Sequence, residues 1–169
     1  TDLPEFEEAE KQVRHRIETL MNIKGKRSVD SIHKELGHIM WKHVGMARDA
    51  AGLQEAIEKL KVLKKEFWSN VRIPGKPYDL NVELEKALRL ADFIETGALM
   101  AHDALDRAES CGGHFRSEHQ TEEGEALRHD DKFMYVSCWE YRGEDKDPVM
   151  QKEMLNYQFV VPQTRNYKK

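Results

Sequence analysis

The sequence predicts a mostly α-helical domain: an antiparallel bundle of three long helices and one shorter helix, followed by a C-terminal loop and β-hairpin. Apolar residues recur every three or four positions through much of residues 6–108, which is the period of amphipathic helices. Short connections between the first three helical segments favour antiparallel neighbours. After residue 113 the pattern changes to the period-two alternation of strands.

The first two helical segments carry recognisable start and stop signals. The apolar face of the first segment consists of Phe6, Ala9, Val13, Ile17 and Leu20. Pro4 lies near its start, where a helix tolerates proline, and Gly25 ends it. The apolar stripe of the second segment consists of Val29, Ile32, Leu36, Ile39 and Met40. Ser28 is its predicted N-cap, and the stripe fades at VGMARD.

The third and fourth segments complete the predicted bundle. The third begins near Asp49 and continues through Phe67, and a loop with two prolines and a glycine follows it (NVRIPGKPYDL). Asn81 is the predicted N-cap of the fourth segment. The apolar face of that segment consists of Leu84, Leu88, Ala91, Ile94, Ala98, Ala101, Leu105 and Ala108. Its alanines let a neighbouring helix approach closely, so residues 1–108 are expected to form a spectrin-repeat-like bundle.

A hairpin is expected within the remaining residues, 109–169. KFMYVSCWEY (132–141) and MLNYQFVV (154–161) are rich in aromatic and β-branched residues that alternate with period two. The charged stretch RGEDKDPVMQKE lies between them and is expected to be the turn. Because two strands alone are only marginally stable in water, the hairpin should pack on the bundle or on a domain that this chain lacks.

The composition excludes several classes of function. The 169 residues carry a net charge of −4, and the basic residues are interleaved with acids, so nucleic acid is not an expected partner. No apolar run is long enough to cross a bilayer, and no signal peptide is visible. The two cysteines, Cys111 and Cys138, are too few for a disulfide framework and are expected to be reduced thiols.

The sequence offers no metal centre and no catalytic motif. The possible ligands Cys111, His114, His119 and His129 match none of the common zinc spacings. A second set of histidines lies on the predicted helices and is expected at exposed or core-edge positions: His33, His38, His43 and His102. HExxH, a Walker lysine loop, a nucleophile elbow and a strand-linked GxGxxG are all lacking. No catalytic residue is therefore assigned to this chain.

The stretch ESCGGHFR (109–116) has two interpretations. Gly112 and Gly113 either stop the preceding helix or let another group come close to the backbone. His114 and Arg116 follow at once, and Arg128 comes shortly afterwards. These side chains are either solvated or directed at an anionic group, which the rigid guanidinium fork suits.

ESCGGHFR resembles the loop, commonly ESRGAHxR, that follows the last long helix in the C-terminal domain of succinate dehydrogenase and fumarate reductase flavoprotein subunits. RHDD resembles the arginine-plus-DD element of the same family, and TRNYK resembles its closing tail. Upstream, IHKELGHIMWKHVGMARDAAGLQEAIEKL resembles its helical segment. The resemblance covers nearly the whole chain. Two positions depart from the pattern: Cys111 replaces the usual arginine, which leaves the role of that position in doubt, and Gly113 replaces alanine.

The resemblance implies a fragment of a larger flavoprotein. The opening TDLPEFEEAE has no initiator methionine, which a fragment, processing or an expression scar would each explain. The whole protein would interconvert succinate and fumarate at FAD, in the tricarboxylic acid cycle and electron transport. The fragment would bind no FAD and be inactive alone. The implied partners are the FAD-binding domain of the same chain, an iron–sulfur subunit and a membrane anchor, on the cytoplasmic side of the bacterial inner membrane. Ser110, Gly112, His114, Arg116 and Arg128 would face the flavin domain.

Two other functions stay open from the sequence. The chain could be the C-terminal domain of an L-aspartate oxidase-like flavoenzyme, although the GMAR segment and the aromatic hairpin favour the succinate dehydrogenase side. It could also be a stand-alone helical interaction module whose hairpin edge binds a partner strand.

Overall fold

The computed structural model describes residues 2–143 and 146–164, so residues 165–168 of the TRNYK tail lie outside the described part. The chain divides into two compact units: Thr1–Trp41 with Ala56–Ala98, and Lys42–Glu55 with Leu99–Lys169. Helices α3 (Ala50–Asn70) and α4 (Val82–Asp106) each contribute to both units. The predicted class, a helical bundle followed by a C-terminal hairpin, is confirmed.

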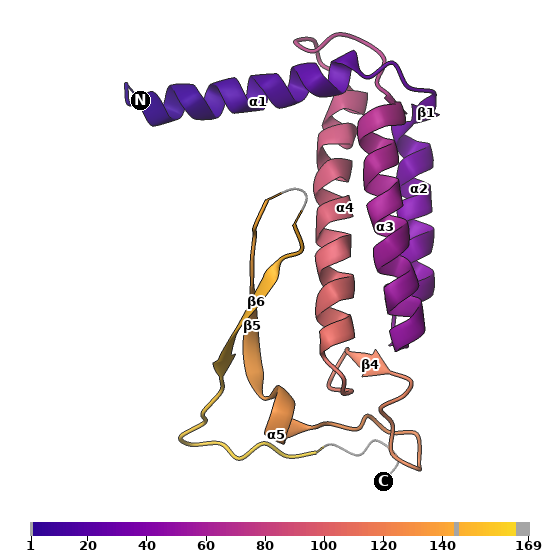
Figure 1. The fold of residues 1–169 in the computed structure, drawn as a ribbon, viewed down its shortest axis with the longest axis vertical. Helices are drawn as coiled ribbons and strands as arrows, with labels where there is room; N and C mark the ends of the chain where they lie inside the picture. The colour runs from indigo at the N-terminus through magenta and orange to yellow at the C-terminus, as the bar shows by residue number, and fades with distance from the viewer. Residues whose placement is uncertain (1, 144–145, 165–169) are drawn as a thin grey trace. The chain divides into compact units, whose positions relative to one another are not determined.

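In the first unit, α2 (Val29–Ile39) lies beside α3 and α4, and the three helices alternate in direction (Figure 1). Their starts are capped by side chains. The predicted caps are confirmed, because Ser28 Oγ accepts a hydrogen bond from the Ser31 amide at 3.2 Å and Asn81 Oδ1 accepts one from the Leu84 amide at 3.0 Å. Such caps satisfy amides that have no partner inside the helix.

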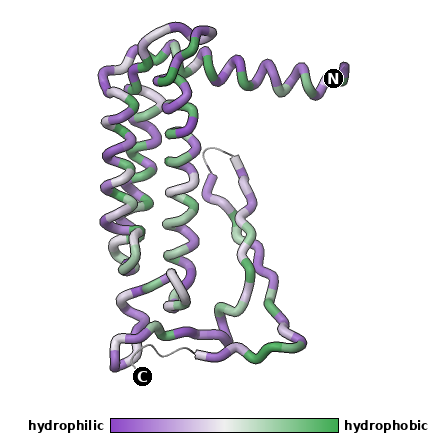
Figure 2. The backbone as a smooth tube through the Cα atoms, turned by 180° about the vertical axis from the view of Figure 1, so that it is seen from behind, coloured by the Kyte–Doolittle hydropathy of each residue, from purple (hydrophilic) through white to green (hydrophobic). Residues whose placement is uncertain are grey.

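Most of the core of the first unit comes from the predicted stripes, but Val71 and Leu90 belong to none of them, and the predicted Leu88 is only partly buried. Its most buried large side chains are Leu20, Val29, Ile32, Leu60, Leu63, Phe67, Val71, Leu90 and Ile94. Burying each of the larger ones contributes about 1.5–3 kcal/mol to folding. Ala87 and Ala91 are buried on α4, where small side chains permit close helix approach. Figure 2 shows the corresponding alternation of hydrophobic and hydrophilic residues along these helices.

Helix α1 (Pro4–Asn22) departs from the predicted packing. Of its apolar stripe only Leu20 is buried, whereas Phe6 and Val13 are more than half exposed. The periodicity correctly predicted a helix with one apolar face. It did not predict burial, because an apolar face can pack against another protein segment as well as against this chain.

Between α2 and α3 the backbone changes character. Met40–Val44 forms a single π-helical segment, η1, which explains why the α-helical stripe fades there. Asp49 Oδ1 then accepts a hydrogen bond from the Gly52 amide at 2.7 Å at the start of α3. π-Helical turns are rare and occur often at functional sites. Within the described residues, no helix is long and apolar enough to span a membrane.

In the second unit, β5 (Tyr135–Glu140) pairs antiparallel with β6 (Val149–Met154). The second strand was predicted at residues 154–161, and this position was wrong. The true strand, except for Met154, lies within the stretch that was expected to be the turn. Five of its six residues are exposed, so the strand faces water and tolerates charged side chains. Such a strand lacks the apolar alternation from which strands were predicted.

One face of β5 lies against the last turns of α4. Ser137 Oγ and Trp139 Nε1 both donate to Asp103 Oδ1 at 2.8 Å, and the Tyr135 hydroxyl donates to Asp106 Oδ2 at 3.0 Å. The hairpin is therefore held by polar contacts as well as by the burial of Tyr135.

Candidate functional site

The loop that follows α4 folds back on itself around Ser110. This side chain is fully buried, and its hydroxyl both accepts from the Arg116 amide at 2.8 Å and donates to the Arg116 carbonyl at 3.1 Å. The Ser110 amide donates to the Leu127 carbonyl at 2.8 Å. Ser110 therefore closes the loop from inside the domain and does not form its outer surface.

The tip of the loop is a tight turn over residues 111–114. The Cys111 amide donates to the His114 carbonyl at 2.8 Å, and the His114 amide donates to the Cys111 carbonyl at 3.0 Å. Gly112 has a φ of +59°, which favours glycine, whereas Gly113 has no positive φ. α4 ends at Asp106, so the glycine pair does not stop the helix. A Cβ at either glycine would meet nothing within 4 Å, which leaves the tip open to a neighbour.

His114 is locked behind this tip in one tautomer. Arg48 Nη2 lies 2.8 Å from His114 Nδ1, and the Arg107 carbonyl lies 2.8 Å from Nε2. Because a guanidinium only donates and a carbonyl only accepts, Nδ1 must be the acceptor and Nε2 must carry the proton. Burial lowers the pKa of His114, and the charges of Arg48, Arg116 and Arg107 lower it further against the opposing hydrogen bond to the Arg107 carbonyl.

Arg48 is a site residue that sequence reasoning did not select. Two short strands, β2 (Ala47–Arg48) and β4 (Phe115–Arg116), pair in parallel and bring it to the loop. Its pKa is lowered by burial and by the charge of Arg116, while the charge of Asp103 opposes this shift. Its Nε is buried, with no hydrogen-bond partner among the described residues. Strands of two residues leave no periodic signal, although the GMAR resemblance contains this arginine.

Arg116 links the end of α4 to the start of α3 within the second unit. Its buried guanidinium donates to the Ala104 and Leu105 carbonyls at 2.8 and 3.2 Å and pairs with Glu118 at 3.2 Å. Glu118 also accepts from the Ala50 amide, at the first turn of α3. Burial raises the pKa of Glu118, but the hydrogen bonds from Arg116 and Ala50 outweigh it and lower that pKa to about 2.

A second ion pair anchors the root of the loop. Arg107 pairs with the buried Glu109 at 3.0 Å and donates to the Phe133 carbonyl at 2.9 Å. Its guanidinium also lies over the Tyr135 ring, 4.7 Å from the centroid. Glu109 accepts from the His129 amide at 2.9 Å with its other oxygen. Satisfied buried ion pairs of this kind define a single arrangement of the chain.

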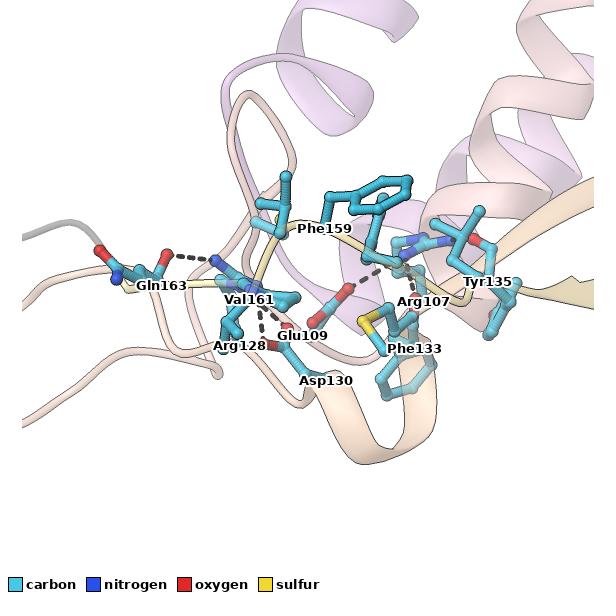
Figure 3. Close-up of a pocket in the computed structure, with 15 residues that line it drawn as sticks. Arg107, Glu109, Arg128, Asp130, Phe133, Tyr135, Phe159, Val161 and Gln163 are labelled. Atoms are coloured by element: carbon cyan, nitrogen blue, oxygen red, sulfur yellow. Dashed lines mark hydrogen bonds and ion pairs between the residues drawn. The ribbon is translucent and has the colours of Figure 1, made fainter.

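Arg128 lies at one side of an open cavity of about 960 Å³ (Figure 3). It holds Asp130 through two hydrogen bonds of 2.9 and 2.6 Å, and it donates to the Gln163 carbonyl at 2.9 Å. The hydrogen bond with Asp130 is the main cause that raises the pKa of Arg128. The cavity is also lined by Arg107, Cys111 and the stretch that follows β6.

The side chains that the sequence offered as possible metal ligands, but without a common zinc spacing, are placed as follows. His119 and His129 lie edge to face with ring centroids 5.8 Å apart, and among the described residues no group of three or more His, Cys, Asp or Glu side chains is placed to hold a metal. Cys111 and Cys138 are both free and exposed. His43 is buried rather than at the core edge, and its Nε2 lies 3.7 Å from Glu55 Oε1.

The five predicted site residues therefore play different parts. Gly112 is at the exposed tip, His114 is half-buried behind it, and Ser110 and Arg116 are buried and hold the loop. Arg128 lies at the cavity, apart from this cluster in its contacts. Both ring nitrogens of His114 are occupied, so this imidazole is not a free base. The hydrogen bonds of Ser110, His114 and Arg116 hold the loop in one arrangement.

Comparison with known proteins assigns most of the chain to the family that the sequence motifs resemble. The family described as the fumarate reductase flavoprotein C-terminal region matches residues 33–167. The fumarate reductase flavoprotein subunit of Helicobacter pylori is 27% identical over 153 residues, which are 89% of this chain and 20% of that protein.

Two solved structures share the fold. A quinol–fumarate reductase solved with menaquinol superposes with a TM-score of 0.80 at 26% identity, covering 96% of this chain and 27% of that chain. The Escherichia coli quinol fumarate reductase gives 0.74 at 25% identity, covering 94% and 26%. The chain thus spans about a quarter or less of these relatives. The match supports the succinate dehydrogenase side over the aspartate oxidase-like and stand-alone alternatives, and the chain belongs to the fumarate reductase flavoprotein C-terminal family, as the C-terminal domain of a fumarate reductase/succinate dehydrogenase flavoprotein.

Proposed function

We propose that the whole protein is an FAD-dependent oxidoreductase that interconverts succinate and fumarate, and that this domain supports an active site built by the preceding part of the polypeptide. The observation that carries the proposal is the family match over residues 33–167, which includes the complete loop after α4. Alone, the domain is expected to be inactive, because the active site is proposed to be built by the preceding part of the polypeptide.

The loop is proposed to be the surface that meets the flavin-binding domain. Gly112 and Gly113 are exposed with open space around them, so another backbone can approach closely. His114 and Arg116 hold this tip from behind, and Ser110 closes it. Arg48, Arg107 and Arg116 make the environment of His114 positive, which suits a polar or anionic neighbour. Arg128 is proposed to belong to the same face, where it fixes residues near the C-terminus.

The glycine pair of the loop lacks the setting of a dinucleotide-binding glycine loop. Gly112 and Gly113 form a turn that returns along β4, and they do not follow a strand or open a helix, as a phosphate-cradling glycine loop does. FAD is therefore expected in the preceding part of the protein, with none bound by this domain.

The partners of the whole protein are proposed from its relatives. An iron–sulfur subunit and a quinone-reactive membrane anchor would connect the flavoprotein to a quinone, on the cytoplasmic side of the bacterial inner membrane. One of the solved relatives contains menaquinol, which supports a quinone-linked role.

The test uses the full-length flavoprotein. FAD per polypeptide and the turnover of fumarate with a reduced dye are measured for the wild type and for His114→Ala/Arg116→Ala. The matched control is His33→Ala/Arg89→Ala, which removes the same two residue types from exposed positions. We expect the site variant to lose flavin or turnover and the control to keep both. Wild-type flavin content and turnover in the site variant would contradict the proposed role of the loop. A wild-type protein without flavin would contradict the proposed activity.

A further inference from the structure

The stretch 155–163, which follows β6, carries apolar side chains that this domain leaves uncovered. It reads LNYQFVVPQ and contains no charged residue. Phe159 is 94% exposed, Val161 79%, Val160 65% and Tyr157 50%. In Figure 2 the section after β6 is hydrophobic over residues 159–161, with hydrophilic residues on either side. Natural proteins seldom leave such an uncharged, strand-forming segment open to water, because it pairs with other chains.

Both ends of the stretch are fixed. The Leu155 amide donates to the Met134 carbonyl at 3.0 Å, which continues the pairing of the hairpin, and Arg128 holds the Gln163 carbonyl at 2.9 Å. Between these anchors, residues 156–162 make no backbone hydrogen bond to any other described residue. The amides of residues 156–161 and the carbonyls of residues 156–162 therefore have no backbone partner among the described residues, along a segment that is held at both ends.

The sequence of this stretch is that of a strand. Its β-branched and aromatic residues alternate with period two, which is why a strand was predicted at residues 154–161. The structure places the strand earlier, at β6, and leaves the following residues without a strand partner among the described residues. Strand-forming side chains and unpaired backbone groups together are what an added strand from another segment requires.

Space is available beside the stretch. Phe159 and Val161 line the same open cavity of about 960 Å³ as Arg107, Arg128 and Phe133, as Figure 3 shows. Arg107 and Arg128 are already paired with Glu109 and Asp130, so the cavity presents apolar surface bordered by neutralised charges. Such a surface suits apolar side chains rather than a small anion.

We infer that residues 157–161 form a docking strand for the part of the same polypeptide that precedes this domain. A strand of that part pairs with the free backbone groups, and its apolar side chains cover Phe159 and Val161. The inference rests on the proposed function. It gives the domain a second contact surface, separate from the loop after α4.

Two observations favour this occupant over a second copy of the chain or another subunit. The domain spans only 20–27% of its relatives, so most of the flavoprotein lies outside it. Arg128, a residue of the proposed flavin-facing surface, directly holds the end of the stretch. An uncharged interface is also typical of contacts that form once and stay buried.

The experiment places a photoreactive benzoylphenylalanine at position 159 of the full-length protein, expressed with its partner subunits. The control protein carries it at Val62, which is 65% exposed on α3. After irradiation, peptide mapping is expected to join position 159 to the preceding part of the same chain, without an increase in polypeptide mass. A crosslink to a second copy or to another subunit, or a yield no higher than that of the Val62 control, would overturn the inference.

A hydrogen-exchange measurement on the full-length protein gives an independent readout. A strand that pairs along one edge protects alternate amides. About half of the amides of residues 157–161 are therefore expected to exchange at least about tenfold more slowly than unprotected amides, and Phe159→Asp/Val161→Asp should remove that protection. Exchange at the unprotected rate in the wild type would contradict docking. Flavin content and turnover are recorded on the same samples, so a flavin-loaded, active protein without crosslink or protection would refute this surface alone.

Discussion

Arg48 Nη2 donates to His114 Nδ1 at 2.8 Å, although the two residues are 66 positions apart. The contact joins the segment after the π-helical turn to the loop after α4 and fixes the tautomer of the histidine. The bond requires an unprotonated acceptor at Nδ1. It is therefore lost when His114 is protonated, or when it is replaced by a residue without an acceptor.

Replacing His114 tests the acceptor directly. His114→Ala is expected to destabilise the domain by about 1–3 kcal/mol, because Nη2 of Arg48 loses its acceptor in a half-buried site. His114→Gln should recover much of this loss, since an amide also offers one acceptor and one donor. Urea unfolding of the three proteins measures the difference. Equal losses for alanine and glutamine would contradict a role in hydrogen bonding.

The pH dependence of stability follows from the lowered pKa of His114. The unfolded chain binds a proton near the ordinary value of 6.5, whereas the folded domain binds it only at lower pH. The stability that the neutral imidazole contributes is therefore complete above pH 6.5 and is lost as pH falls below it. Unfolding free energies at pH 8, 6.5 and 5.5 should fall more steeply in the wild type than in His114→Gln. Parallel curves would reject the assigned shift.

Glu118 contributes in a more acidic range. Its pKa is about 2 in the folded domain against an ordinary 4.5, so its contribution is present above pH 4.5 and is lost as pH falls towards 2. The side chain is 39% exposed, so the effect is expected to be small. NMR titration of the Glu118 carboxyl provides the measurement, and Arg116→Lys should raise the midpoint. A midpoint near 4.5 in the wild type would show that the pairing is absent.

The two glycines of the tip should respond differently to alanine. Gly112→Ala is expected to cost about 1 kcal/mol, because φ of +59° is unfavourable for a residue with a Cβ. Gly113→Ala should be nearly neutral for the stability of the domain, because a Cβ there meets nothing within 4 Å and φ is not positive. Each variant is the control for the other in thermal unfolding. Similar losses at both positions would contradict the observed turn.

Ser110 is predicted to matter for folding rather than for contact with a neighbour. Ser110→Ala leaves the buried Arg116 amide without its acceptor, which costs about 1–3 kcal/mol. Ser110→Cys keeps the size but supplies a much weaker acceptor, so it should be intermediate. Chemical unfolding of both variants checks this order, and an unchanged midpoint for Ser110→Ala would refute it.

Periodicity and capping residues predicted α2, α3, α4 and the existence of the hairpin, because each depends on neighbours within a few positions. The position of β6 was not predictable from the sequence. Its charged residues Lys152 and Glu153 face water, and a charged segment of this kind is also typical of a turn. The exposure of α1 was missed for a related reason: periodicity reports an apolar face but not what covers it.

The loop was identified from its glycines and basic residues, but its internal structure was not. Arg48 and Glu118 contact it through the two-residue pairing of β2 with β4 and through the first turn of α3. These contacts join distant parts of the chain, and neither leaves a local pattern. Ser110 was expected to face another domain, and only its depth in the structure shows that its hydroxyl serves the loop itself.

The division of the chain has a consequence for its synthesis. Residues 42–55 belong to the second unit, but their partners at residues 99–118 leave the ribosome only after the intervening helices have been made. Until they are made, the Arg48 guanidinium can bond to the Val44 carbonyl but not to His114. The first unit ends at residue 98, so it can collapse around its leucines during this interval.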